Sequence, residues 1–164
     1  MNNKINKTFQ KASWLNRGAL FVVFFWFGFL KIIGTSPAEG LVTELFKLTL
    51  SSFMELETFL PLFGALECIL GILWLMPNLT KWAFLSLMAH MACTFLPMVL
   101  LPTFTWQSFL TLTLVGQYIV KNVVLIGSSW FIYTLYRAKE EKAHLLDEPS
   151  EVIENLTVTI TAEV

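Results

Sequence analysis

Charged residues are scarce through the middle of this chain, and their scarcity sets the class of protein. Lys, Arg, Asp and Glu make up 14% of the 164 residues, against about 25% in ordinary soluble domains. Most of these charges lie at residues 1–17 and 137–164. The apolar middle excludes an ordinary soluble fold and predicts an integral membrane protein. The formal net charge of −1 gives no hint of nucleic acid, so no such partner is expected.

Cysteine and histidine are nearly absent as well. Cys68 and Cys93 lie in separate apolar runs, and there is no CxxC pair or His/Cys spacing suited to zinc or haem. A bis-histidine haem within one chain is excluded because His90 is the only histidine in an apolar run. We therefore expect no metal and no intrinsic cofactor. A redox pair of cysteines stays open beside the simpler interpretation that both are small interior residues.

The chain is rich in apolar runs of about 20 residues, the length that crosses a bilayer. Pro77 and Pro102 mark turns after two of these runs, and the last run is long enough to tilt or protrude. We expect an all-α fold, an integral membrane four-helix bundle within residues 1–136. The predicted spans are residues 18–34, 58–76, 82–101 and 109–136.

The loops and ends predict an orientation in the membrane. Residues 41–53 have apolar side chains at helical spacing over a stretch too short to cross, which predicts a short interfacial helix between spans one and two. Lys and Arg are concentrated at both chain ends and at Lys81, so the positive-inside rule places both termini in the cytoplasm. A signal peptide cleaved near Pro37 is disfavoured because the apolar run is long and Lys31 interrupts its end.

The carboxyl-terminal segment differs in composition from the rest. Residues 137–164 are acidic and polar, and we expect a disordered cytoplasmic tail. Thr alternates with aliphatic residues over 156–160, so a short strand there stays open.

Four ionisable residues lie within or close to the predicted spans, namely Lys31, Glu67, His90 and Lys121. A charge in lipid is costly and calls for a partner. With a rise of 1.5 Å per residue, Glu67 and His90 fall about 13–17 Å below the outer boundary and Lys121 about 20 Å below it. We therefore expect Glu67 to pair with Lys121, which has Gln117 one turn away on its own face while Asn122 points elsewhere.

Two interpretations of this polar layer stay open. It is either a structural cluster that fixes helix register or a ligand site, and Lys31 is either a member of the site or an anchor that reaches the interface. For the ligand site, Pro97 predicts a bend in span three, and Gly28 and Gly64 predict local room. The expected pocket is bounded by Lys31, Glu67, His90 and Lys121, with Trp26 and Trp74 as aromatic walls.

Three segments carry a family resemblance in their order along the chain: RGALFVVFFWFGFLKIIG, GALECILGILWL and GQYIVKNVVLIGSSWF. Together they resemble the DoxX-like membrane proteins of the YkgB-type branch, over about residues 14–136. The resemblance rests on the FGxxK, GxxExxxG and GxYxxK patterns and on an arginine ahead of span one. It carries over the polar positions Arg17, Lys31, Glu67 and Lys121. Gln117 and Asn122 stand where the family pattern often has an arginine and an aspartate, so the second charge pair is missing here.

The resemblance implies a function as well as a fold. It implies a small bacterial inner-membrane protein of the oxidative or reactive-chlorine stress response. The first of three functions that we consider is a redox-linked membrane subunit whose polar layer holds the head of a quinone. Two other functions stay open: a permease or channel for a small solute or proton, and a membrane scaffold. The expected partners are the lipid bilayer and either a membrane oxidoreductase or further copies of the chain. Whether the protein is an enzyme is left open.

Overall fold

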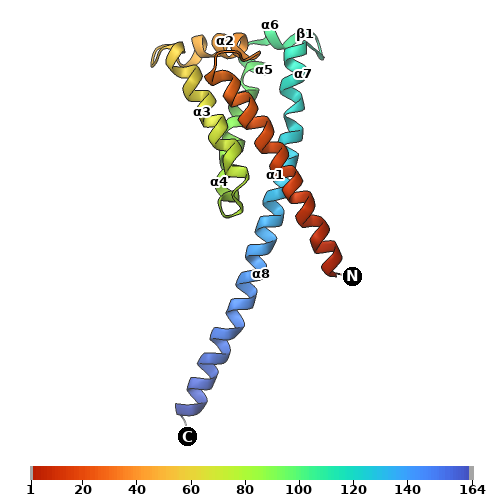
Figure 1. The fold of residues 1–164 in the computed structure, drawn as a ribbon, viewed down its shortest axis with the longest axis vertical. Helices are drawn as coiled ribbons and strands as arrows, with labels where there is room; N and C mark the ends of the chain where they lie inside the picture. Colours follow the sequence, from red (N-terminus) through yellow and green to blue (C-terminus); the bar gives the residue numbers. More distant parts are fainter. Residues whose placement is uncertain (1, 163–164) are drawn as a thin grey trace.

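The computed structural model describes the backbone of residues 2–162 and the side chains of residues 7–144. It is mostly helical, and four of its helical segments are long and apolar enough to cross a membrane (Figure 1). Each segment overlaps one predicted span, so the prediction of a helical fold with four membrane-length segments is confirmed. These segments are Lys7–Ile32, Leu56–Trp74, Pro77–Leu100 and Leu114–His144.

Helices α1 (Asn2–Ile32) and α3 (Leu56–Trp74) pack closely through small residues. A Cβ atom added to Gly28 would lie 2.5 Å from the carbonyl oxygen of Gly64, and one added to Gly64 would lie equally close to the carbonyl of Gly28. Gly71 lies against the backbone of Phe25. Small residues let membrane helices approach in this way, so the two glycines do not provide the local room that was predicted. We call the contact of Gly28 with Gly64 the glycine crossing.

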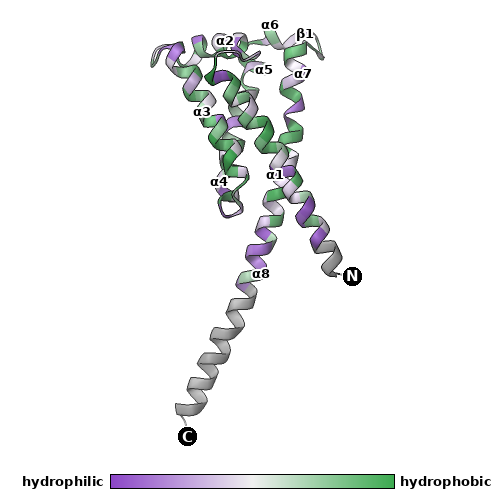
Figure 2. Ribbon diagram, viewed as in Figure 1, coloured by the Kyte–Doolittle hydropathy of each residue, from purple (hydrophilic) through white to green (hydrophobic). Residues whose placement is uncertain are grey.

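One core holds α1 and α3 against α4 (Thr80–Phe95) and α8 (Val123–Ala162). A short 3-10 turn, η1 (Pro77–Leu79), connects α3 to α4 where Pro77 predicted a turn. Many large apolar side chains are instead exposed, as expected of surfaces that face lipid. Figure 2 shows that the helices of the bundle are mostly hydrophobic along their length. The buried apolar core consists of Leu20, Phe24, Leu70, Trp74, Ala83, Phe84, Leu87, Met91 and Ile132.

Short elements gather at the end of the bundle away from both termini (Figure 1), and we call this end the outer end. Helix α2 (Glu39–Thr49) confirms the short helix predicted between spans one and two, although it begins and ends earlier than 41–53. Phe46 is buried and Leu48 is exposed, as in an amphipathic helix. Its position at a membrane surface stays a prediction. The other short elements are α5 (Pro97–Leu100), α6 (Pro102–Thr105), β1 (Trp106–Ser108) and β2 (Thr111–Leu112).

The fourth span begins later than predicted because residues 106–112 form a hairpin. Strands β1 and β2 pair antiparallel, with Trp106 opposite Leu112. Phe109 and Leu110 are 90% and 77% exposed at the turn, and Leu110 has a φ of 58°. The helix α7 (Leu114–Lys121) follows, and its N-cap is Thr113, whose hydroxyl accepts a hydrogen bond from the amide of Gly116. A threonine N-cap is the local signal that ends the hairpin and starts the helix.

The third membrane-length segment is interrupted at Pro97, where a bend was predicted. Helix α4 ends at Phe95 and α5 begins at Pro97, with the amide of Leu96 donating to the carbonyl of Cys93 at 3.2 Å. Proline lacks an amide hydrogen and cannot continue the regular ladder. The helix is therefore interrupted at Pro97, while the bend predicted there stays a prediction.

Helix α8 continues well past the predicted end of span four at residue 136. It runs to Ala162 through the segment predicted as a separate polar tail, so the strand considered for 156–160 is wrong. Residues 137–142 are mostly Lys, Glu, Arg and Ala, which favour helix, and the Tyr136 hydroxyl donates to Glu140 one turn on. Both termini lie at the same end of the bundle (Figure 1), as an even number of crossings requires.

Candidate functional site

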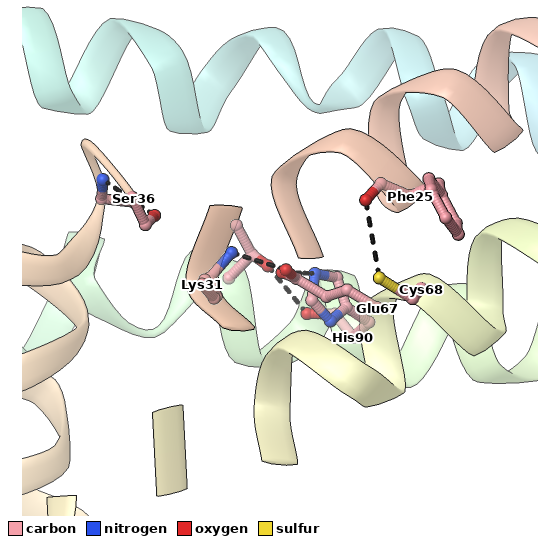
Figure 3. A network of polar contacts seen from close by, with 8 residues as sticks. Phe25, Lys31, Ser36, Glu67, Cys68 and His90 are labelled. Atoms are coloured by element: carbon pink, nitrogen blue, oxygen red, sulfur yellow. Dashed lines mark hydrogen bonds and ion pairs between the residues drawn. The ribbon is translucent and has the colours of Figure 1, made fainter. Parts of the chain in front are cut away.

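A buried ion pair joins the end of α1 to the middle of α3. The Lys31 ammonium donates to Glu67 Oε2 at 2.5 Å, and the side chains of both residues are 6% exposed. Figure 3 shows the two side chains pointing toward each other across the helix pair. Lys31 is therefore a member of the buried polar group and not an anchor at the interface, because its ammonium is directed into the bundle.

The glycine crossing places the two charges together. Lys31 follows Gly28 by three residues and Glu67 follows Gly64 by three, so each charge lies on the same face of its helix as the glycine. A Cβ atom on Gly64 would lie only 2.9 Å from Cβ of Lys31. The close backbone approach thus shortens the distance that the lysine side chain has to span.

His90 of α4 completes the cluster. Its Nε2 lies 3.4 Å from Glu67 Oε1, so the carboxylate faces a cation on one oxygen and an imidazole on the other (Figure 3). The ring is held edge-on by Phe24 at 5.4 Å and face-on by Phe63 at 5.5 Å between centroids. We call Lys31, Glu67 and His90 the buried triad.

A row of aromatic rings runs from the outer end of the bundle to the buried triad. Phe46 of α2 lies 4.9 Å from Phe59, Phe59 lies 5.4 Å from Phe63, and Phe63 stacks on His90. The Phe63 ring also lies under the Lys31 ammonium, at 5.4 Å. We call Phe46, Phe59 and Phe63 the aromatic row. Sequence reasoning missed it, although Phe59 and Phe63 are spaced one turn apart on the helix that carries Glu67.

The predicted pairing of Glu67 with Lys121 is wrong. Glu67 pairs with Lys31 and His90, and the exposed Lys121 instead lies over the Tyr118 ring at 4.9 Å. The prediction treated the helices as parallel rods and compared depths alone, whereas the crossing of α1 over α3 decides which cation reaches Glu67. Gln117 is exposed on α7, and Asn122 lies at the break between α7 and α8.

The expected aromatic walls do not line the buried triad. Trp26 is 62% exposed on the outside of α1, and Trp74 is fully buried in the core. The Trp74 carbonyl accepts a hydrogen bond from Arg17 at 3.0 Å, near the end of α3 that leads into η1. Arg17 also donates to the Thr80 hydroxyl at 2.7 Å. This arginine therefore joins α1 to the turn between α3 and α4, away from the triad that it was expected to support.

The two cysteines occupy different environments. The Cys68 thiol lies 3.5 Å from the carbonyl of Phe25, within the contact between α1 and α3 (Figure 3). Cys93 is an exposed free thiol on α4. Cys68 thus has the packing role of a small interior residue.

The buried triad is closed by its own contacts and by aromatic rings. Lys31 and Glu67 neutralise each other, and His90 adds a third titratable group that shares the same carboxylate. Such a group of side chains can hold and exchange protons within an apolar surrounding. Two hollows in the described residues lie against α1, one of them lined also by Pro77 and Lys139. The pocket expected among Lys31, Glu67, His90 and Lys121 stays a prediction.

No protein-family model matches the chain, and no curated protein or solved structure matches it either. The likeness to DoxX-like membrane proteins therefore stays a prediction that rests on the ordered motifs of the sequence.

Proposed function

We propose that the chain is a redox-linked membrane subunit in which the buried triad exchanges protons with the head of a membrane quinone. The observation that supports this proposal is the aromatic row, which connects the outer end of the bundle to three titratable groups. For a purely structural role, the ion pair of Lys31 and Glu67 would be sufficient, since its two charges cancel. His90 adds a proton-bearing ring whose face continues the stack of Phe63.

The residues of the triad suit this role chemically. When bound, a quinone supplies two-electron chemistry, with one electron and one proton taken up at each carbonyl oxygen and the electrons delivered by a partner oxidoreductase. Lys31 and His90 both carry N–H donors of the kind that protonate a carbonyl oxygen. Glu67 holds both donors in place, and Phe63 covers both of them. Movement of the Phe63 ring would therefore open the triad to a planar ligand.

The proposal includes a location and a biological setting. Four membrane-length segments and the distribution of Lys and Arg favour a multi-pass protein of a bacterial inner membrane, with both termini in the cytoplasm. The outer end and the start of the aromatic row then face the other side. The resemblance to the YkgB-type branch supports a role in the response to oxidative or reactive-chlorine stress as part of this proposal.

A direct test measures the quinone that purifies with the protein. We expect the wild-type chain to retain quinone, measured by mass spectrometry, and we expect His90→Leu to lose it without a large change in unfolding temperature. Vesicles and cells that carry His90→Leu should also show slower quinol oxidation and greater sensitivity to hypochlorous acid. Phe53→Leu is a matched control, because Phe53 is 82% exposed and lies outside the aromatic row. Equal quinone retention by wild type and His90→Leu would contradict the proposal.

A second candidate function is a membrane scaffold, and the closure of the triad favours it. A cluster whose polar groups are satisfied by one another can fix the register of the helices without binding any ligand. If the wild-type protein carries no quinone, and His90→Leu changes neither quinol oxidation nor stress sensitivity, the scaffold becomes the better account.

A further inference from the structure

A separate polar site lies at the end of the bundle nearer the termini. A hollow of about 220 Å³ opens there between α1, the start of η1 and α8. It is distinct from the buried triad, and none of its residues belongs to the aromatic row. We call it the inner hollow; it is lined by Gln10, Ser13, Trp14, Arg17, Pro77 and Lys139.

Arg17 brings an uncompensated positive charge to the inner hollow. It is only 5% exposed, and its two hydrogen bonds go to neutral acceptors, the carbonyl of Trp74 and the hydroxyl of Thr80. Among the side chains of residues 7–144, no carboxylate lies within ion-pair distance of it. A guanidinium has five N–H donors, so three remain after these two bonds. A buried charge of this kind is costly unless an opposite charge meets it.

The other walls of the inner hollow favour the same kind of ligand. Lys139 adds a second cation from α8, and Gln10 and Ser13 add neutral hydrogen-bonding groups. Trp14 stands exposed at the rim, as interfacial tryptophans do. Basic pockets between membrane helices on the cytoplasmic side commonly hold the phosphate of an anionic headgroup. Arginine matches phosphate well because its planar fork presents two parallel donors.

From these observations we infer that the inner hollow binds a phosphate group, carried either by an anionic lipid or by a free phosphate. The bound phosphate would supply the negative charge that Arg17 lacks and would join α1 to α8 through Lys139. This inference stands apart from the proposed function, because it concerns different residues at the other end of the bundle.

Native mass spectrometry of the purified full-length protein tests the inference. Phosphatidylglycerol, phosphatidylcholine and inorganic phosphate are titrated separately, and then inorganic phosphate is added against bound phosphatidylglycerol. We expect one phosphatidylglycerol to bind in preference to phosphatidylcholine. Lys139→Gln should weaken that binding roughly fivefold, the factor that corresponds to one basic residue at an anionic surface. If inorganic phosphate binds and displaces the lipid, the ligand is a free phosphate.

The matched control is Lys142→Gln, an exposed lysine on the same helix that does not line the inner hollow. It should leave binding unchanged. Arg17→Gln is less informative because Arg17 also holds the turn between α3 and α4. Equal weakening by Lys139→Gln and Lys142→Gln would show attraction to general surface charge and overturn the inference. Failure of both phosphatidylglycerol and inorganic phosphate to bind the wild type would overturn it as well.

Discussion

Glu67 is a buried carboxylate whose stability depends on its two partners. Its carboxylate is held in an apolar surrounding by a lysine from one helix and a histidine from another. Removing two charges from water costs several kcal/mol per ion, and their attraction offsets that cost only when the geometry is close. Losing one partner is therefore more harmful than losing both.

This asymmetry gives a prediction at the residue scale. Glu67→Gln leaves the Lys31 ammonium buried without its counter-charge and should lower the free energy of unfolding by about 3–5 kcal/mol. The double variant Glu67→Gln with Lys31→Gln should recover much of that loss. Chemical unfolding in detergent measures both changes.

Two controls make the residue-scale test specific. Glu67→Gln with Lys121→Gln should not recover stability, because Lys121 lies over Tyr118 and outside the triad. Breaking the exposed pair of Glu44 and Lys47 should change stability by less than about 1 kcal/mol. Recovery by the Lys121 variant and not by the Lys31 variant would show that the pairing in the structure is incorrect.

The residues of the candidate site were predicted from the sequence, but their pairing was not. An ionisable residue in an apolar run stands out by composition alone, which identifies Lys31, Glu67 and His90. To decide whether Lys31 or Lys121 pairs with Glu67, one has to know how the helices are rotated and where they cross. The depth of each residue along a straight helix axis does not give this information. The matching patterns of Gly28 with Lys31 and Gly64 with Glu67 held this information, because equal spacing from a close contact places both charges on facing surfaces.

At the scale of elements, the contact between α1 and α3 decides the site. Gly64→Ala should lower the free energy of unfolding by about 1–3 kcal/mol, because its Cβ would meet the Gly28 carbonyl at 2.5 Å and push the backbones apart. It should also separate Lys31 from Glu67. Thermal unfolding of the purified protein measures the stability change.

Gly127→Ala is the control for this element-scale prediction. Nothing lies within 4 Å of a Cβ added to Gly127 on α8. Alanine favours helix over glycine by about 1 kcal/mol, so the control should be neutral or slightly stabilising. If Gly64→Ala behaves like Gly127→Ala, the glycine crossing is not closely packed.

The elements themselves were predicted with uneven success for physical reasons. Long apolar runs identify membrane-length helices because few other structures need them. The hairpin was missed because Phe109 and Leu110 are apolar residues, which suggested part of a membrane span, whereas both are exposed at the turn of the hairpin. Hydropathy does not show where a short connection ends and a helix begins. The threonine at position 113 is the sequence signal for that boundary, because its hydroxyl caps the first turn of α7.

At the scale of the whole molecule, the arrangement predicts which surfaces can be reached from outside the cell. In a variant with both cysteines replaced by alanine, Phe53→Cys at the outer end should react with a membrane-impermeant thiol reagent in intact cells. Glu141→Cys should react only after the cells are opened, because it lies in the later part of α8, which runs toward the C-terminus and away from the outer end (Figure 1). Labelling of Glu141→Cys in intact cells would contradict the predicted orientation.

The distance along the chain between Lys31 and Glu67 has a consequence for biosynthesis. The two residues are 36 positions apart, so Lys31 is synthesised before its carboxylate partner. At 5–20 residues per second, that interval lasts roughly two to seven seconds. Until α3 packs against α1, Lys31 has no counter-charge, and we expect it to stay near the interface on its extended stem, as lysines at helix ends do. We therefore expect α1 to reach its final depth only once the ion pair with Glu67 has formed.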